Sequence, residues 1–92
     1  MKKTYEEVMQ IVNELRGCEE WIQFRSCQAY HSTPKTTSKG TFILFKSYHT
    51  IVALVDIDNR VLYRLGKWSR TTSKQTTQFH SAYYPMYEQV QF

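Results

Sequence analysis

The sequence has few cysteines and no long apolar run. Only two of its 92 residues are cysteine, Cys18 and Cys27, whereas a small secreted domain usually carries more and pairs them in disulfides. We therefore expect free or partly buried thiols in a reducing cytoplasm. No apolar stretch is long enough to span a membrane, and the first residues lead into an acidic amphipathic segment. We expect neither a membrane partner nor a signal peptide.

Motifs for catalysis and metal binding are also scarce. The sequence contains no pair of carboxylates arranged for acid–base catalysis, no nucleophile elbow, and no glycine-rich phosphate loop among its three glycines. Cys18, Cys27 and His31 could form a Cys–His nucleophile, but no oxyanion-donor motif accompanies them. These residues also lack the spacing of a zinc site, and a fourth ligand would be the distant His49 or His80. We predict no enzymatic activity, no cofactor and no metal.

Asp56 and Asp58 resemble the opening of a calcium-binding loop. The sixth position of such a loop would be Val61, where glycine is needed, and the twelfth would be Lys67, where glutamate is needed. We therefore interpret both aspartates as turn residues.

Acidic residues are rare after residue 20. Residues 1–20 contain three basic and five acidic side chains, whereas the rest of the chain contains nine basic and three acidic ones, for a net charge of +4. Five basic residues follow one another without an intervening acid: Arg60, Arg64, Lys67, Arg70 and Lys74. They predict a positive surface suited to phosphate or to the acidic face of another protein.

The start of the chain predicts a helix over residues 4–15. Thr4 and Glu7 fit a capping box, and apolar residues recur at three- and four-residue steps. Gly17 is the expected stop of this helix.

The middle of the chain predicts an antiparallel β-meander of three to four strands. Three short apolar runs, 41–46, 51–57 and 60–65, are joined by short turns. Apolar and polar residues alternate at the start of 21–31, which predicts a further strand. The polar stretch 32–40 is expected to be a mobile loop.

The last part of the chain predicts a short helix. Thr72 and Gln75 fit a capping box, and Pro85 would limit the helix to roughly ten residues. Residues 86–92 alternate weakly and could form an edge strand or a docked extension. The expected fold is one α+β domain with an N-terminal helix, the meander, a short C-terminal helix and this candidate edge strand.

Two segments, SYHTIVA at 47–53 and LYRLGKWSRTTSKQTTQF at 62–79, resemble a pattern in small uncharacterised proteins encoded by bacteriophages and other mobile elements of Gram-positive bacteria. In that pattern an SY-T-VA strand leads to a hairpin, to LY, and to a helix start of the type YS-x-TTSK. Here Trp68 stands where the pattern has Tyr, and Gln75 stands where it has His. The resemblance implies a mobile-element setting in a bacterial host cell. Short cytoplasmic proteins in that setting often bind nucleic acid or inhibit host machinery, including defence systems.

Three groups of residues are candidates for binding. A nucleic-acid or acidic-partner surface would use basic and aromatic side chains, namely Arg60, Arg64, Lys67, Trp68, Arg70 and Lys74, with Tyr48 and His49 at the preceding bend. A phosphate contact could come from hydroxyls at the expected helix start, which would serve equally as helix caps: Ser69, Thr71, Thr72 and Ser73. A protein interface could come from an aromatic and methionine cluster, whose alternative role is core packing: Tyr83, Tyr84, Met86 and Tyr87.

Two functions follow from these candidates. The first is a non-enzymatic accessory protein of phage type that binds and inhibits a host protein or a protein–nucleic-acid complex, as a counter-defence inhibitor would. The alternative is a protein that binds DNA or RNA directly through the basic residues between 60 and 74.

Overall fold

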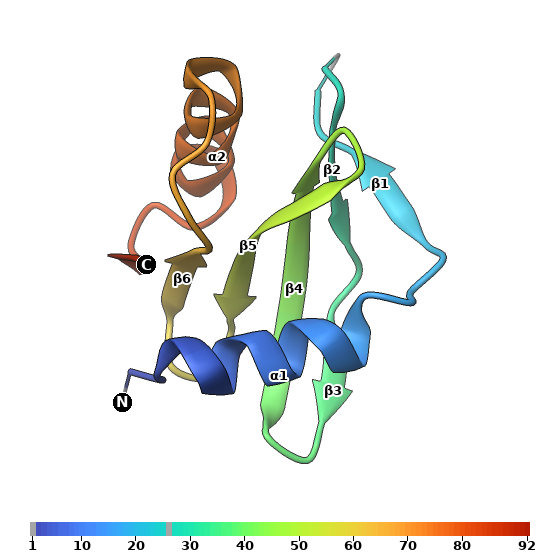
Figure 1. The fold of residues 1–92 in the computed structure, drawn as a ribbon, viewed down its shortest axis with the longest axis vertical. Coiled ribbons are helices and arrows are strands. Elements are labelled where there is room, and N and C mark those ends of the chain that lie inside the picture. The colour runs from blue at the N-terminus through green and yellow to red at the C-terminus, as the bar shows by residue number, and fades with distance from the viewer. Residues whose placement is uncertain (1, 26) are drawn as a thin grey trace.

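The computed structural model describes residues 2–25 and 27–92, so Met1 and Ser26 lie outside it. In chain order its elements are α1 (Tyr5–Leu15), β1 (Trp21–Gln23), β2 (Ala29–Ser32), β3 (Lys35–Thr37), β4 (Gly40–Ser47), β5 (Thr50–Asp56), β6 (Val61–Arg64), α2 (Arg70–Tyr83) and β7 (Glu88–Gln91). The strands form one sheet in the order β1-β2-β4-β5-β6-β7, and β3 pairs with the half of β4 that β2 leaves free. Only β6 and β7 pair in parallel, among the strands described (Figure 1). Neither helix in the described part of the chain is long and apolar enough to cross a membrane.

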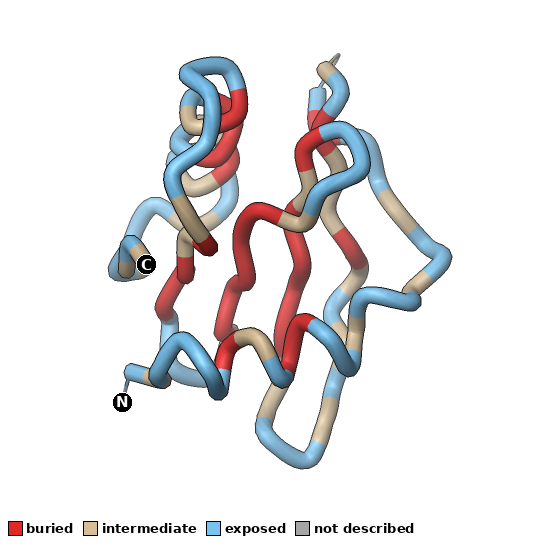
Figure 2. Tube along the Cα trace, in the orientation of Figure 1, coloured by how far each residue is buried: buried red, intermediate tan, exposed pale blue. Residues whose placement is uncertain are grey.

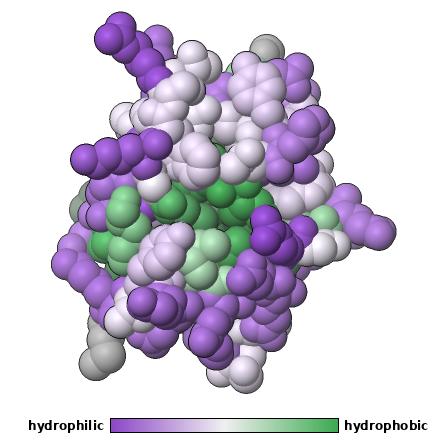
Figure 3. Space-filling view, viewed as in Figure 1, coloured by the Kyte–Doolittle hydropathy of each residue, from purple (hydrophilic) through white to green (hydrophobic). Residues whose placement is uncertain are grey.

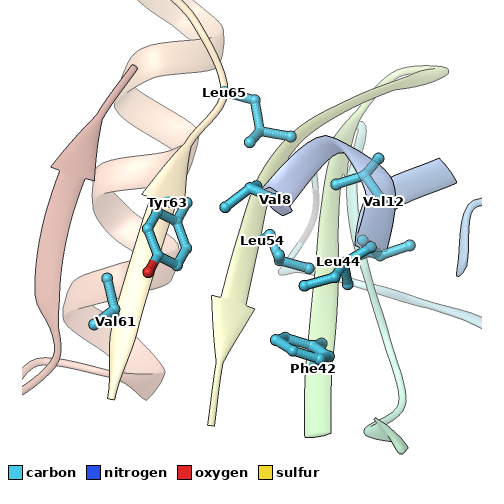
Figure 4. Packing of buried hydrophobic residues seen from close by; sticks show 9 residues of the cluster. Val8, Val12, Phe42, Leu44, Leu54, Val61, Tyr63 and Leu65 are labelled. Atoms are coloured by element: carbon cyan, nitrogen blue, oxygen red, sulfur yellow. The ribbon is translucent and has the colours of Figure 1, made fainter. Parts of the chain in front are cut away.

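Helix α1 begins at the predicted capping box. The Thr4 side chain accepts a hydrogen bond from the Glu7 N–H, and the Glu7 carboxylate accepts one from the Thr4 N–H. Hydrogen bonding of the Glu7 carboxylate by the Thr4 N–H, and by the Thr4 side chain, lowers the pKa of Glu7 below its ordinary value. The helix packs an apolar stripe on the sheet (Figure 4), and the buried residues of this stripe are Val8, Ile11 and Val12.

The two helices cover opposite faces of the sheet, and each face has its own core. The α1 face is lined by Phe42, Leu44, Leu54, Val61, Tyr63 and Leu65. The α2 face is lined by Phe24, Ile43, Phe45, Val55, Leu62 and Phe79. Because β4 and β5 are buried on both faces (Figure 2), their sequences are nearly continuous apolar runs. Seen from the α1 side, hydrophobic residues lie at the centre of this face and hydrophilic residues surround them (Figure 3).

The prediction of one strand over 21–31 was wrong, because this segment forms a hairpin of β1 and β2. The turn region is closed by a hydrogen bond from the Phe24 N–H to the Ala29 carbonyl (2.8 Å), and Arg25 has a positive φ of 56°. Ser26, which falls within the predicted strand, is outside the described residues.

The polar segment 32–40 is also more ordered than predicted, because it contains β3. This strand pairs with the start of β4, with Lys35 opposite Phe42 and Thr37 opposite Gly40. Gly40 has a φ of 130°, a backbone conformation that favours glycine, so it closes the tight turn between the two strands. In the described part of the chain the sheet has seven strands, rather than the three to four predicted. The difference arises because residues 21–31 contribute to two strands and because β3 and β7 add one strand each.

Helix α2 starts earlier than predicted and is therefore longer than the roughly ten residues expected. Its N-cap is Ser69, whose side chain accepts a hydrogen bond from the Thr72 N–H (3.3 Å). The predicted capping box of Thr72 and Gln75 was wrong, because both side chains are buried inside the helix–sheet interface. The helix has 14 residues and ends two positions before Pro85. After it, β7 forms the edge strand that the weak alternation of 86–92 allowed.

Candidate basic surface at the start of helix α2

Three segments that are distant in sequence meet at one end of the molecule. The Tyr48 N–H donates to the Gln28 carbonyl (2.7 Å), which joins the β4–β5 turn to the β1–β2 loop. The Ser47 hydroxyl donates to Gln75 Oε1 (2.8 Å) and is hydrogen-bonded to the Thr72 hydroxyl (3.0 Å), which joins the same turn to α2. The β1–β2 loop, the β4–β5 turn and the first turns of α2 therefore form one continuous surface, at the top of Figure 1.

This surface carries basic and aromatic side chains and no acidic ones. We call it the basic end, and define it by its exposed residues Arg25, Tyr48, His49, Lys67, Trp68, Arg70, Thr71 and Lys74. The three segments that build it, 24–28, 46–50 and 64–75, contain no aspartate or glutamate in their sequence. Since no carboxylate in these segments neutralises the cations, the basic end has a positive field directed at solvent.

Trp68 is the central aromatic residue of the basic end. Its indole ring lies over Gly66: a Cβ atom placed on Gly66 would be 3.7 Å from each of three ring atoms, Cε2, Cζ2 and Nε1. The equal distances indicate that one flat face of the ring covers the side of Gly66 from which a side chain would project. The side chain is still 41% exposed, so the ring is supported from behind and open in front. Such a ring can stack on an unpaired base or on another planar group.

Arg64 is half-buried, and its side chain bonds to neighbouring elements of the fold. Its guanidinium donates to the Ser73 carbonyl, to the Thr77 hydroxyl and to Gln89 Oε1, at 2.9, 3.1 and 2.9 Å. These bonds tie β6 to α2 and β7, and burial lowers the pKa of the guanidinium. Through these hydrogen bonds Arg64 links β6, α2 and β7.

Arg60 is also separated from the basic end. It lies in the β5–β6 turn with a φ of 55°, whereas Lys67 follows the other end of β6. The full length of that strand therefore separates the two side chains. Of the six residues predicted for a basic surface, the structure brings together four: Lys67, Trp68, Arg70 and Lys74.

The four hydroxyl-bearing residues predicted for a phosphate contact also have different environments. Ser69 caps the helix, and the buried Thr72 is bonded to Ser47. Ser73 is half-buried, and its carbonyl accepts bonds from Arg64 and from the Thr77 hydroxyl. Thr71 and Ser69 are the exposed residues of the group, and Thr71 lies next to Arg70.

The predicted protein interface is only partly exposed. Its four residues are Tyr83, Tyr84, Met86 and Tyr87. Tyr84 packs against Phe79 and Tyr87, and burial, with the neighbouring tyrosines, raises the pKa of its hydroxyl to about 12. The Tyr87 carbonyl accepts a hydrogen bond from His80 Nε2 (2.7 Å). Tyr83 and Met86 are the exposed members, at 54% and 87%.

Arg25 is a residue of the basic end that the sequence alone did not indicate. It is far from residues 60–74 in the chain, and it arrives at this end only because β1 and β2 form a hairpin next to β4. Its guanidinium lies 5.1 Å from the centre of the Phe24 ring. No local pattern around Arg25 could have shown this placement.

The aspartates and cysteines considered for metal binding have structural partners. Asp56 accepts hydrogen bonds from Lys3 and Asn59, and Asp58 Oδ2 accepts one from the Thr41 N–H, which confirms their assignment to a turn. Cys18 and Cys27 are free thiols, and the Cys27 thiol donates to the Phe24 carbonyl. Within residues 2–25 and 27–92, no three His, Cys, Asp or Glu side chains gather in a way that could hold a metal ion.

Comparison with known proteins identifies one related family. The model of DUF8033, a family of unknown function, matches residues 3–88. No curated protein matches the chain, and no solved structure matches it.

Proposed function

The chain belongs to DUF8033, and we propose that it is a non-enzymatic protein that binds nucleic acid through the basic end. The observation that carries this proposal is the combination of Lys67, Arg70 and Lys74 with the supported indole of Trp68, on a surface built from segments without acidic residues. The cations would contact backbone phosphates, and Trp68 would stack on a base.

The physical expectation is a salt-dependent interaction. Each phosphate that a lysine or arginine neutralises releases condensed counterions, so the logarithm of the binding constant falls by roughly one unit per unit of log salt for each contact. Three free cations at the start of α2 predict a slope of about −2 to −3, with Arg25 able to add to it. A fluorescence-anisotropy titration of short single- and double-stranded DNA and RNA at two salt concentrations measures this slope.

Charge reversal tests whether the basic end is the binding site. Arg70→Glu with Lys74→Glu should weaken binding to every nucleic acid tested by at least tenfold, because two phosphate contacts become repulsive. The double variant should stay folded, since both side chains are exposed and an acidic residue at position 70, the first of the helix, is favourable.

The matched control is Lys35→Glu with Lys39→Glu at the opposite end of the sheet. Each pair of reversals changes the net charge by −4, from +4 to 0, so the two variants share the same overall charge. Only the pair at the basic end should lose most of the affinity. Equal losses in both variants, or no binding by the unmodified protein, would contradict the proposal.

A second candidate function is an accessory protein of phage type that binds and inhibits a host protein or nucleoprotein in the bacterial cytoplasm. It is supported by the resemblance of residues 47–53 and 62–79 to mobile-element proteins and by the exposed pair Tyr83 and Met86. Tyrosine and methionine are enriched at protein interfaces. Affinity purification from a Gram-positive host lysate should recover a stoichiometric partner, and Tyr83→Ser with Met86→Ser should release it. Failure to recover a partner would remove this candidate.

A further inference from the structure

The outer edge of β7 presents free backbone hydrogen-bonding groups. The N–H groups of Glu88 and Phe92 donate to the carbonyls of Arg60 and Arg64 on β6 (3.1 and 3.0 Å). Because alternate residues of a strand direct their backbone groups to opposite sides, the N–H and C=O groups of Gln89 and Gln91 point away from the sheet. Among the described residues no strand pairs with this edge, which is the left border of the molecule in Figure 1.

After the charged Glu88, this edge lacks the charges, prolines and bulges that usually prevent strand addition. Monomeric proteins protect edge strands with charges, prolines, bulges or very short strands. The segment Gln89-Val90-Gln91 contains none of the first three. The other border of the sheet differs, because β1 has only three residues and is followed by the positive φ of Arg25.

Side-chain contacts fix β7 against its neighbours. Gln89 Oε1 accepts a hydrogen bond from Arg64, and the Gln91 amide donates to the Gly66 carbonyl (both 2.9 Å). Lys2 forms an ion pair with Glu88 at the start of the strand. The strand is therefore fixed in an extended form, so pairing with a second strand would not require β7 to be ordered first.

We propose that two copies of the chain form a symmetric dimer by antiparallel pairing of β7 with β7. In this register Val90 lies on the two-fold axis, and Gln89 of each copy is opposite Gln91 of the other. Each of these opposed pairs exchanges two backbone hydrogen bonds, so every outward N–H meets an outward C=O. The two sheets become one continuous sheet. This inference is independent of the function proposed for the basic end.

A second copy fits this edge because its own β7 is already held extended and offers the same outward groups, whereas a flexible peptide would first have to be ordered. Strand β7 runs parallel to β6, and β6 leads directly into Lys67 and the basic end. Antiparallel pairing therefore places the two basic ends at opposite extremes of the dimer, where two chains of net charge +4 repel each other least. The strand has four residues, so the interface is small, and we expect a weak dimer whose population depends on concentration.

A cysteine on the proposed axis tests the register directly. In an antiparallel pair without mutual hydrogen bonds the opposed Cα atoms are about 4.5 Å apart, which is within the range of about 4.4–6.8 Å that a disulfide spans. Val90→Cys should therefore form a covalent dimer under mild oxidation, as seen on a non-reducing gel. Val90 is half-buried and small, so the variant should fold, which circular dichroism checks.

The controls are Gln91→Cys and the unmodified protein. In this register two copies of residue 91 are offset along the strands by about two residues, or about 7 Å, in addition to the strand spacing, which is too far for a disulfide. The unmodified protein, with Cys18 and Cys27, measures non-specific oxidation. Cross-linking of Val90→Cys at least tenfold faster than both controls supports the dimer. Equal rates would overturn it.

Sedimentation equilibrium gives a second, non-covalent test. The unmodified protein should shift from monomer to dimer as its concentration rises. Gln89→Pro should remain monomeric, because proline removes an outward N–H and none of the backbone bonds to β6. Gln89→Ala is its control, because it loses the same side-chain bond to Arg64 but keeps the outward N–H, and it should still dimerise. An unmodified protein that stays monomeric across the accessible range would also overturn the proposal.

Discussion

At the scale of single residues, the buried Asp56 holds together three parts of the chain. Its carboxylate accepts hydrogen bonds from Lys3 Nζ (2.7 Å), from the Asn59 side chain (2.8 Å) and from the Asn59 N–H (3.2 Å). The N–H of Lys3 in turn donates to the hydroxyl of the buried Tyr63 (2.7 Å). Asp56 thereby fixes the segment before α1 to the sheet and closes the β5–β6 turn.

These contacts give stability that depends on pH. Burial by itself raises the pKa of the Asp56 carboxyl, but the hydrogen bonds from Lys3 and Asn59 outweigh burial and lower the pKa below its ordinary value. The resulting stabilisation is fully present above the unfolded-state pKa of about 3.9 and is lost as the pH falls through the lower folded-state pKa.

We therefore predict that Asp56→Asn lowers the free energy of unfolding by about 1.5–3 kcal/mol at pH 7, because a neutral amide replaces the charged acceptor of the bonds from Lys3 and Asn59. The difference from the unmodified protein should shrink as the pH falls below about 4. Urea titrations at several pH values measure it.

Asp58→Asn is the control for Asp56→Asn. Asp58 is exposed, and an amide oxygen could still accept the bond from the Thr41 N–H, so the change should stay within about 0.5 kcal/mol. A pH-independent loss in Asp56→Asn would show that the carboxylate charge is not what stabilises this turn.

At the scale of elements, the start of α2 depends on side chains that point in different directions. Ser69 caps the first turn, whereas Thr72 and Gln75 point inward and bond to Ser47 at the end of β4. These inward bonds give the buried side chains of Ser47, Thr72 and Gln75 their hydrogen-bond partners. Among the described residues, no buried polar side-chain atom lacks a partner. This polar contact fixes where the exposed cations of the helix lie relative to the β4–β5 turn.

Ser69→Ala should therefore destabilise the protein by about 1 kcal/mol, because the Thr72 N–H loses its capping partner. The neighbouring Thr71→Ala should change the stability by less than about 0.5 kcal/mol, since that side chain is exposed. Both values come from urea denaturation followed by circular dichroism. Equal effects of the two substitutions would contradict the assignment of Ser69 as the cap.

At the scale of the whole molecule, the two cores share the central strands. Leu44 faces the α1 core and its neighbour Phe45 faces the α2 core, so β4 connects both. Phe45 also stacks on Phe79 of α2, with ring centres 4.3 Å apart. Loss of packing on either face must therefore weaken the same sheet.

We predict that Leu44→Ala and Phe45→Ala each shift one common unfolding transition, by about 2–5 and 3–5 kcal/mol respectively. Circular dichroism and tryptophan fluorescence should give coincident curves in both variants. Ile22→Ala, at an exposed site on β1, serves as the surface control and should cost about 0.5 kcal/mol or less. Separate transitions for the two probes would show that the two cores unfold independently.

The sequence by itself determined the elements whose signals are local. The capping box at Thr4, the apolar stripe of α1 and the doubly buried runs of β4 and β5 depend on residues a few positions apart, so they could be read directly. The excess of basic side chains after residue 20 was visible in the same way.

Only the tertiary structure decided which of those basic residues are available for binding. Arg64 is held by α2 and β7, Arg60 lies at the far end of β6, and Arg25 joins the basic end through the β1–β2 hairpin. The same holds for β3, and for the N-cap of α2 at Ser69 in place of Thr72. The physical reason is that these placements depend on hydrogen bonds and packing between segments far apart in the chain, which no local pattern of residues encodes.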